Sequence, residues 1–249
     1  MNPYLAEFIG TALLILFGNG VVANVVLART KGNNAGWIVI TAGWGIAVYI
    51  GAFCSDKFSG AHLNPAVSVA MAFADPAKFP IEKLFRYIGA QMAGGIVGGT
   101  LVFLFYREHF KASTDADGKL ACFCTAANIR NHAQSLFCEV VGTFALILPI
   151  FLMVAPSLTI GDAPDPTPLG LGTLGLLPVA LLVFGIGLSL GGTTGYAINP
   201  ARDLGPRIAH FLLPIPGKRD SDWGYAWVPV IGPILGGLLA AWVHRCLTA

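Results

Sequence analysis

Two Asn-Pro-Ala triplets carry the side chains of this sequence that are best suited to bind a neutral solute. They are Asn64, Pro65 and Ala66, and later Asn199, Pro200 and Ala201. Asparagine is a preferred N-cap residue, and proline is favoured at the first helical position, where its missing N–H costs nothing. Each triplet therefore predicts the start of a helix. A helix start carries about half a positive charge, and the asparagine amide can donate hydrogen bonds beside it. Two such starts brought together would repel cations and bind hydroxyl groups.

The four residues before each triplet are expected to be extended and to offer backbone carbonyls as a ladder of acceptors. The predicted solute-lining residues are Gly60, Ala61, His62, Leu63, Asn64, Ala197, Ile198 and Asn199. His62 would contribute its backbone carbonyl, because no nucleophile or metal ligand stands beside it in the sequence. No cofactor and no metal is expected.

The elements that position these residues must lie in a membrane. The 249 residues are 55% hydrophobic and 11% charged, with a mean hydropathy of +0.70. Six apolar segments are about long enough to cross a bilayer: residues 5–27, 37–54, 84–106, 135–156, 173–191 and 225–247. Strand-like alternation is absent, so the prediction is an all-α membrane protein rather than a barrel. The net charge of +2 comes with scattered Lys and Arg, so nothing indicates a nucleic-acid surface.

The second half of the chain repeats the first. Glu7 and Glu139 open similar spans, and the two Asn-Pro-Ala triplets follow at similar places; the two offsets are 132 and 135 residues. Each half, about 1–111 and 134–249, has three spans, so the second half must enter the membrane in inverted orientation. Each triplet falls between the second and third span of its half, before a segment too short to cross. We therefore expect two re-entrant half-helices meeting near the midplane of one domain, residues 1–249.

Paired Asn-Pro-Ala motifs in an inverted six-span repeat resemble the aquaporin family, and Asn-Pro-Ala-Arg-Asp at 199–203 resembles its glycerol facilitator branch. The resemblance covers nearly the whole chain. It implies the aquaporin fold, a homotetramer with a pore in each protomer, and a selectivity filter at four positions, here Trp44, Gly187, Tyr196 and Arg202. It also implies cytoplasmic termini in the plasma membrane. Only five Lys and Arg would then lie inside, against ten outside, so this orientation rests on the resemblance alone.

The chemistry of these four residues suits polyols. Arg202 can donate hydrogen bonds to hydroxyls, while Trp44 and Tyr196 form an apolar corner for carbon atoms. Gly187 leaves space where water-selective members of the family have histidine. The commonest facilitator filter has Phe at the position of Tyr196, whose hydroxyl would narrow or polarise the site.

Three buried carboxylates are expected to support the loops. Glu7 and Glu139 would accept hydrogen bonds from backbone N–H groups of the re-entrant loops and so turn the carbonyls toward the pore. Asp203 would fix loop geometry in the same way. Glycines at four-residue spacing, at 94, 95, 98 and 99 and at 232, 236 and 237, would let helices approach closely.

The function predicted is passive passage of glycerol, other small neutral polyols and water, with urea a further candidate, and with ions and protons excluded. The alternatives are a water-preferring pore and a proton-coupled secondary transporter using Glu7 or Glu139. An enzyme is not predicted, because the spans contain no metal-ligand cluster and no nucleophile–base pair. The five cysteines are expected to be free thiols.

Overall fold

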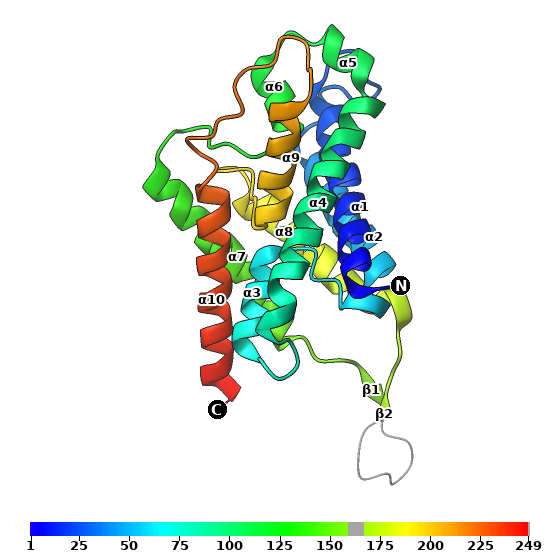
Figure 1. Cartoon of the computed structure of the whole chain (residues 1–249), viewed down its shortest axis with the longest axis vertical. Coiled ribbons are helices and arrows are strands. Elements are labelled where there is room, and N and C mark those ends of the chain that lie inside the picture. The colour runs from blue at the N-terminus through cyan, green and yellow to red at the C-terminus, as the bar shows by residue number, and fades with distance from the viewer. Residues whose placement is uncertain (159–166, 249) are drawn as a thin grey trace.

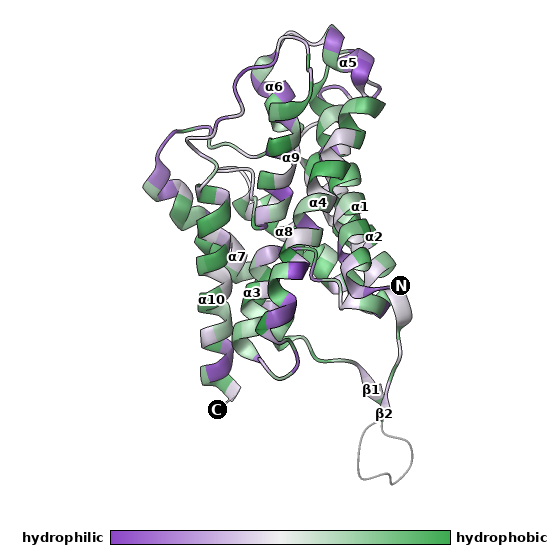
Figure 2. Ribbon diagram, viewed as in Figure 1, coloured by the Kyte–Doolittle hydropathy of each residue, from purple (hydrophilic) through white to green (hydrophobic). Residues whose placement is uncertain are grey.

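Six long apolar helical segments form the frame of the molecule, as the sequence predicts. The computed structural model describes residues 1–158 and 167–248. Within this part of the chain the membrane-length segments are α1 (Pro3–Val26), α2 (Trp37–Ser59), α4 (Ile81–Phe105), α7 (His132–Leu152), the pair η1 (Gly172–Leu176) and α8 (Leu177–Leu190), and α10 (Val228–Thr248). Figure 2 shows hydrophobic residues over most of their length and hydrophilic residues gathered near their ends and at α5.

The helix ends differ from the predicted ones where local chemistry intervenes. Helix α2 continues past the expected end at residue 54. The charged side chains of Asp56 and Lys57 in this added turn are exposed, and the helix stops at Gly60, which has the left-handed conformation. Helix α7 stops at Leu152, before the expected end at 156, and the chain continues extended toward Pro156. The fifth span begins as a 3₁₀ turn, η1, before the 14-residue α8.

Two half-helices begin at the Asn-Pro-Ala triplets: α3 (Pro65–Ala74) and α9 (Pro200–Leu212). The long connection after α4 contains two short helices that the sequence did not predict, α5 (Arg107–Ala112) and α6 (Ala116–Ala121). A two-residue strand pair, β1 (Ser157–Leu158) with β2 (Thr167–Pro168), follows α7. Figure 1 shows α5 and α6 at one end of the molecule, and both termini and the β pair toward the other.

Glycines bring the first and third long helices of each half into close contact, as expected. A Cβ atom placed on Gly94 of α4 would lie 2.4 Å from the carbonyl oxygen of Phe8 on α1. In the second half, a Cβ on Gly236 of α10 would lie 2.3 Å from the carbonyl oxygen of Val140 on α7. Both distances are too short for any side chain larger than hydrogen, so the two halves use the same packing device.

The neighbouring glycines join the two halves. A Cβ on Gly95 of α4 would lie 2.6 Å from the carbonyl oxygen of Ala201, in the half-helix α9. A Cβ on Gly237 of α10 would lie 2.9 Å from the carbonyl oxygen of Ala66, in the half-helix α3. The third long helix of each half therefore packs against the half-helix of the other half. These reciprocal contacts fix the starts of α3 and α9 relative to each other.

Candidate functional site

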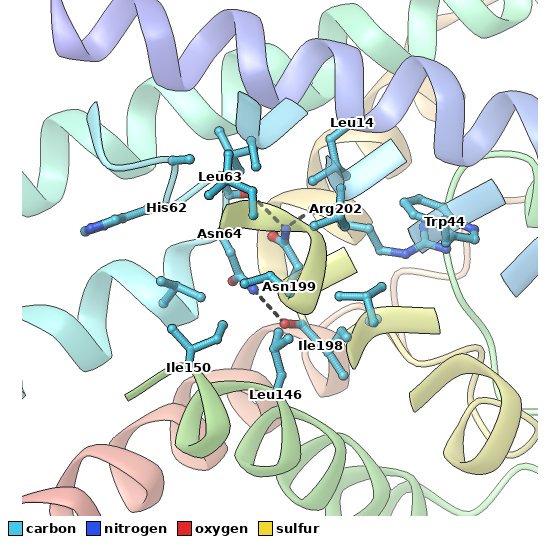
Figure 3. A pocket seen from close by; sticks show the side chains of 18 of the residues that line it. Leu14, Trp44, His62, Leu63, Asn64, Leu146, Ile150, Ile198, Asn199 and Arg202 are labelled. Atoms are coloured by element: carbon cyan, nitrogen blue, oxygen red, sulfur yellow. Dashed lines mark hydrogen bonds between the residues drawn. The ribbon is translucent and has the colours of Figure 1, made fainter. Parts of the chain in front are cut away.

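Asn64 and Asn199 connect the two half-helices through a reciprocal pair of hydrogen bonds. The Asn64 Nδ2 donates to the carbonyl oxygen of Ile198 at 2.8 Å, and the Asn199 Nδ2 donates to the carbonyl oxygen of Leu63 at 2.9 Å. Both bonds are drawn as dashed lines in Figure 3. Each asparagine thus holds the loop that precedes the other, which places the two helix starts face to face.

The same two side chains cap their own helices. The Asn64 Oδ1 accepts from the backbone N–H of Ala66 at 2.9 Å, and the Asn199 Oδ1 accepts from that of Ala201 at 2.9 Å. Because an amide nitrogen carries two N–H groups and the cross-bond uses one, each asparagine keeps a second N–H for another acceptor. Capping by the oxygen and cross-bonding by the nitrogen also fix the direction of that second N–H.

The two loops before the triplets share an unusual backbone. Positive φ angles occur at Gly60, Ala61 and Leu63, and at the matching positions Gly195, Tyr196 and Ile198. Left-handed residues with a side chain cost about 1–3 kcal/mol each and persist only where their surroundings hold them. Both loops therefore need anchors, and in each half a buried glutamate provides one.

Glu7, on α1, anchors the first loop. It is fully buried, and its carboxylate accepts from the backbone N–H groups of His62 at 3.0 Å and Leu63 at 2.7 Å. The hydroxyl of Ser59 at 2.6 Å and the amide of Gln91 at 2.7 Å complete the set. These four donors provide the hydrogen bonds that the buried carboxylate needs in place of water.

Glu139, on α7, does the same for the second loop. Its carboxylate accepts from the N–H groups of Ala197 at 3.0 Å and Ile198 at 2.8 Å, and from the hydroxyl of Thr194 at 2.7 Å. With its N–H groups directed toward a glutamate, each loop presents carbonyl oxygens on its other side. Neither glutamate is among the described residues that line the two cavities below.

A cavity of about 210 Å³ runs past both asparagines. All eight residues predicted to line a solute path border it. Apolar side chains complete the wall, among them Leu14, Val48, Leu146, Ile150 and Val183. Figure 3 shows Asn64 and Asn199 near the middle, with His62 toward one side and Trp44 toward the other. The His62 ring packs against Phe79 at 4.6 Å between centroids, and its Nδ1 lies 3.0 Å from the Ser68 Oγ.

A second cavity, of about 420 Å³, lies on the side of the connection that contains α6. Three of the four predicted filter residues, Trp44, Tyr196 and Arg202, line both cavities and so lie at their boundary. The Arg202 Cζ lies 3.9 Å from the centre of the Trp44 ring, a close cation–π contact. All three side chains are buried. A cation and aromatic surface therefore face each other where the cavities meet.

Gly187, the fourth predicted filter residue, lines neither cavity. It lies behind Tyr196: a Cβ on Gly187 would be 2.8 Å from both the Cζ and the Oη of that tyrosine. The Tyr196 Oη is buried and has no hydrogen-bond partner among the described residues. The hydroxyl expected to narrow or polarise the site thus packs against the backbone of α8, and the glycine makes room for it.

Asp203 and Arg207 form a buried ion pair on α9 whose second member the sequence did not single out. Their atoms approach to 2.8 Å, and both side chains are 0% exposed. Asp203 also accepts from the N–H and the hydroxyl of Thr125, each at 2.7 Å, and Arg207 donates to the Thr125 carbonyl at 2.9 Å. The pair fastens the long connection over the second cavity. The i, i+4 spacing of the two charges was the signal available in the sequence.

The cysteines and acidic residues give no indication of a metal site in the part of the chain that the structure describes. Cys122 and Cys124 are free and buried, and burial raises the pKa of both thiols. They are therefore neutral at physiological pH, and Cys122 donates to the carbonyl of Gly118.

Known proteins match this chain over nearly its full length. The major intrinsic protein family matches residues 1–244. The chain is 51% identical over 247 residues to the probable glycerol uptake facilitator protein of Thermotoga maritima, covering 99% of this chain and 100% of that protein. It is 49% identical over 243 residues to the glycerol uptake facilitator protein of Streptococcus pneumoniae, covering 98% of each. The X-ray structure of the aquaglyceroporin from Plasmodium falciparum matches with a TM-score of 0.82 and 30% identity, over 99% of this chain and 96% of that chain. The chain is therefore a multi-pass membrane protein with the aquaporin fold, and it belongs to the major intrinsic protein family, a family of channels rather than enzymes.

Proposed function

We propose that this protein is a passive channel for glycerol and other small neutral polyols, which also conducts water and excludes ions and protons. The observation that carries the proposal is the two-sided wall of the path. Arg202, Asn64 and Asn199 supply hydrogen-bond donors along the same cavity whose other lining is apolar. A polyol has hydroxyl groups along one side of a carbon chain, which is the pattern this wall matches. The glycerol uptake facilitator of Streptococcus pneumoniae and the probable one of Thermotoga maritima, both similar over nearly the whole chain, support the same solute.

The order of contacts defines the proposed passage. A solute leaving the larger cavity meets Arg202 and Trp44 first, so its hydroxyls accept from the guanidinium while its carbons lie against the aromatic ring. It then reaches the free N–H groups of Asn199 and Asn64 and the carbonyls of the two loops. Each step replaces a water of hydration by a protein group, so the neutral solute moves without a large barrier.

Cations are excluded by the same features. An ion that loses its hydration in a low-dielectric slot pays tens of kcal/mol unless a counter-charge is provided. The charged side chain at the boundary is Arg202, and the helix starts at Asn64 and Asn199 add partial positive charge, so cations are repelled. Trp44, Tyr196 and Arg202, the two triplets and the three buried carboxylates keep their predicted roles in this proposal, whereas Gly187 acts through Tyr196.

The remaining features of the proposal rest on family membership. We expect residues 1–249 to act as one channel domain, assembled as a homotetramer in the plasma membrane with both termini in the cytoplasm. Both termini lie away from α5 and α6 in Figure 1, which fits termini on one membrane face. Large apolar side chains are exposed on the long helices, such as Phe85 and Phe105 on α4. These need lipid or a neighbouring protomer as their surroundings.

Stopped-flow light scattering on reconstituted vesicles tests the proposal. Vesicles with and without the protein are exposed to glycerol and, separately, to an impermeant osmolyte that reports water flow. Fast glycerol entry without an ion or pH gradient is the expected result. Fast water flow with no glycerol entry would establish the water-preferring pore instead. Glycerol entry that requires an imposed pH gradient, and stops when a protonophore removes it, would establish the proton-coupled transporter.

A further inference from the structure

Asn19, on α1, joins two parts of the chain that are far apart in sequence. Its side chain is fully buried. The Nδ2 donates to the carbonyl oxygen of Phe123 at 3.0 Å, and the Oδ1 accepts from the Arg202 Nη1 at 3.4 Å. One amide thus links α1, the long connection after α4 and the start of α9.

The guanidinium of Arg202 has few other anchors. The neighbouring carboxylate of Asp203 is already occupied by Arg207 and Thr125. Within the described residues, Arg202 has no ion-pair partner, and Asn19 is the one group that accepts a hydrogen bond from its side chain. Stacking on Trp44 limits the height of the guanidinium above the ring but leaves it free to slide and turn in the plane. The contact with Asn19 restricts that remaining freedom.

The Asn19 amide is itself held in one orientation. Its Nδ2 needs an acceptor and finds the Phe123 carbonyl, which forces the Oδ1 toward Arg202. Phe123 is 0% exposed, its N–H donates to the Leu120 carbonyl at 2.9 Å, and its ring packs against Phe110 and His210. The Phe123 carbonyl is therefore part of a packed segment. Because Asn19 is bonded to this carbonyl, the Asn19 Oδ1 offers Arg202 an acceptor at a fixed place.

The inverted repeat relates this polar pair, Asn19 of the first half and Arg202 of the second, to a pair of apolar residues. With the offsets of 132 and 135 residues, Asn19 corresponds to Phe151 on α7, and Arg202 corresponds to Val67 on α3. The fold therefore does not need a polar residue at either place. The asparagine occurs on α1 where the arginine of the cavity boundary meets it, whereas the residues related to them by the repeat are apolar. This ties the two residues to each other rather than to the fold.

We propose that Asn19 is a positioning residue for Arg202 and thereby sets how strictly the channel selects among hydroxylated solutes. The inference rests on the proposed function of the pore. A guanidinium held in one place meets the hydroxyls of a short polyol at fixed positions, whereas a guanidinium that moves accepts longer or differently shaped solutes. Asn19 does not touch the solute, because it lines neither cavity among the described residues.

The test compares Asn19→Leu with the wild type in reconstituted vesicles, by the ratio of glycerol to erythritol permeability. Leucine has the same branched arrangement of side-chain heavy atoms and makes neither hydrogen bond. The ratio is expected to fall by about three- to tenfold, because the variant loses both the long contact with Arg202 and the shorter bond to Phe123 that orients the amide. Thr11→Val is the matched control, because Thr11 is a buried polar residue on the same helix whose hydroxyl has no partner in the described part of the chain. Its ratio should equal that of the wild type.

A double-mutant cycle separates positioning from a structural role. If Asn19 acts through Arg202, then Asn19→Leu added to Arg202→Ala changes the ratio no further. A further fall in the double variant would overturn the inference, as would an unchanged ratio in Asn19→Leu or an equal loss of all permeabilities. Asn19→Ser, too short to reach both partners, serves in the same cycle if the leucine variant is not recovered. If vesicles with the wild-type protein show no glycerol permeability, glycerol is not the solute and the proposed function is wrong. The role of Asn19 is then tested by the same cycle with the ratio of water to urea permeability.

Discussion

The phenol ring of Tyr196 lies so close to Gly187 that a Cβ atom on the glycine would be 2.8 Å from the tyrosine Oη. The same Cβ would lie 2.8 Å from the Cγ2 of Thr41 on α2. Gly187 therefore sets the depth at which the tyrosine ring packs into α8, and this depth decides how far the ring extends toward Arg202. The glycine acts on the path through its neighbour rather than by lining it.

Gly187→Ala is expected to lower glycerol permeability by about tenfold or more. A methyl group cannot fit 2.8 Å from the side chains of Thr41 and Tyr196, so we expect the Tyr196 ring to move toward the cavity boundary. The measurement is stopped-flow glycerol entry, with protein content matched between vesicle samples.

Gly185→Ala is the control for that substitution. Gly185 is on the same helix, and a Cβ there meets no heavy atom within 4 Å. Its permeability should match the wild type. Equal permeability in Gly187→Ala and the wild type would show that the ring does not govern the width of the path.

Tyr196→Phe is expected to raise thermal stability by about 1 kcal/mol, because it removes a buried hydroxyl that has no partner among the described residues. It should also restore part of the glycerol permeability lost in Gly187→Ala, since that Oη is one of the three atoms that crowd the new methyl group. Thermal unfolding in detergent and stopped-flow entry measure the two effects. A drop in stability would mean that the hydroxyl is hydrogen-bonded through water.

Residues within the repeated motif could be predicted from the sequence, because the same motif occurs at equivalent positions in both halves. Asn64 and Asn199 are capping residues at equivalent positions, and both cross-bonds follow once the two helix starts meet. Six spans and their approximate ends also followed from hydropathy. The 3₁₀ start of the fifth span did not, because it depends on how the preceding segment enters the bundle.

Residues that act through contacts across the chain were not predictable in this way. Asn19 meets Phe123 across 104 residues and Arg202 across 183, and no local pattern connects such positions. A polar residue inside an apolar span was the one signal available, since burial there requires a partner. The same holds for Thr125, whose role comes from the buried pair Asp203 and Arg207.

Glu139→Gln is expected to lower both thermal stability and glycerol permeability. The wild-type carboxylate only accepts, from Thr194, Ala197 and Ile198, whereas a glutamine places an NH₂ group against at least one of these donors. The loss of one such bond in a buried site costs about 1–3 kcal/mol. Glu82→Gln, exposed in the first turn of α4, is the control and should change neither property. A proton-coupled transporter would behave differently, with stability retained and only the response to a pH gradient lost.

Gly94→Ala should destabilise the protein by several kcal/mol, since its Cβ would lie 2.4 Å from the Phe8 carbonyl oxygen and backbone cannot yield as a side chain does. Gly89→Ala on the same helix has the opposite expectation. A Cβ there meets nothing within 4 Å, so the helix gains about 0.5–1 kcal/mol from the better helix former. Thermal unfolding of both variants in detergent provides the comparison. Similar shifts in both variants would mean that α1 and α4 are not in close contact.

Arg202→Ala is expected to raise cation leak by about tenfold or more while glycerol still passes. A unit charge about 4 Å away contributes about 4 kcal/mol at an effective dielectric constant near 20, and Arg202 provides that charge where the two cavities meet. The helix starts at Asn64 and Asn199 remain, so exclusion should weaken rather than vanish. Dye-reported K⁺ and proton flux into vesicles measures the leak. Arg86→Ala is the control, because Arg86 is exposed beside Tyr4 and lines neither cavity. An unchanged leak in Arg202→Ala would assign ion exclusion to the two asparagine-capped helix starts alone.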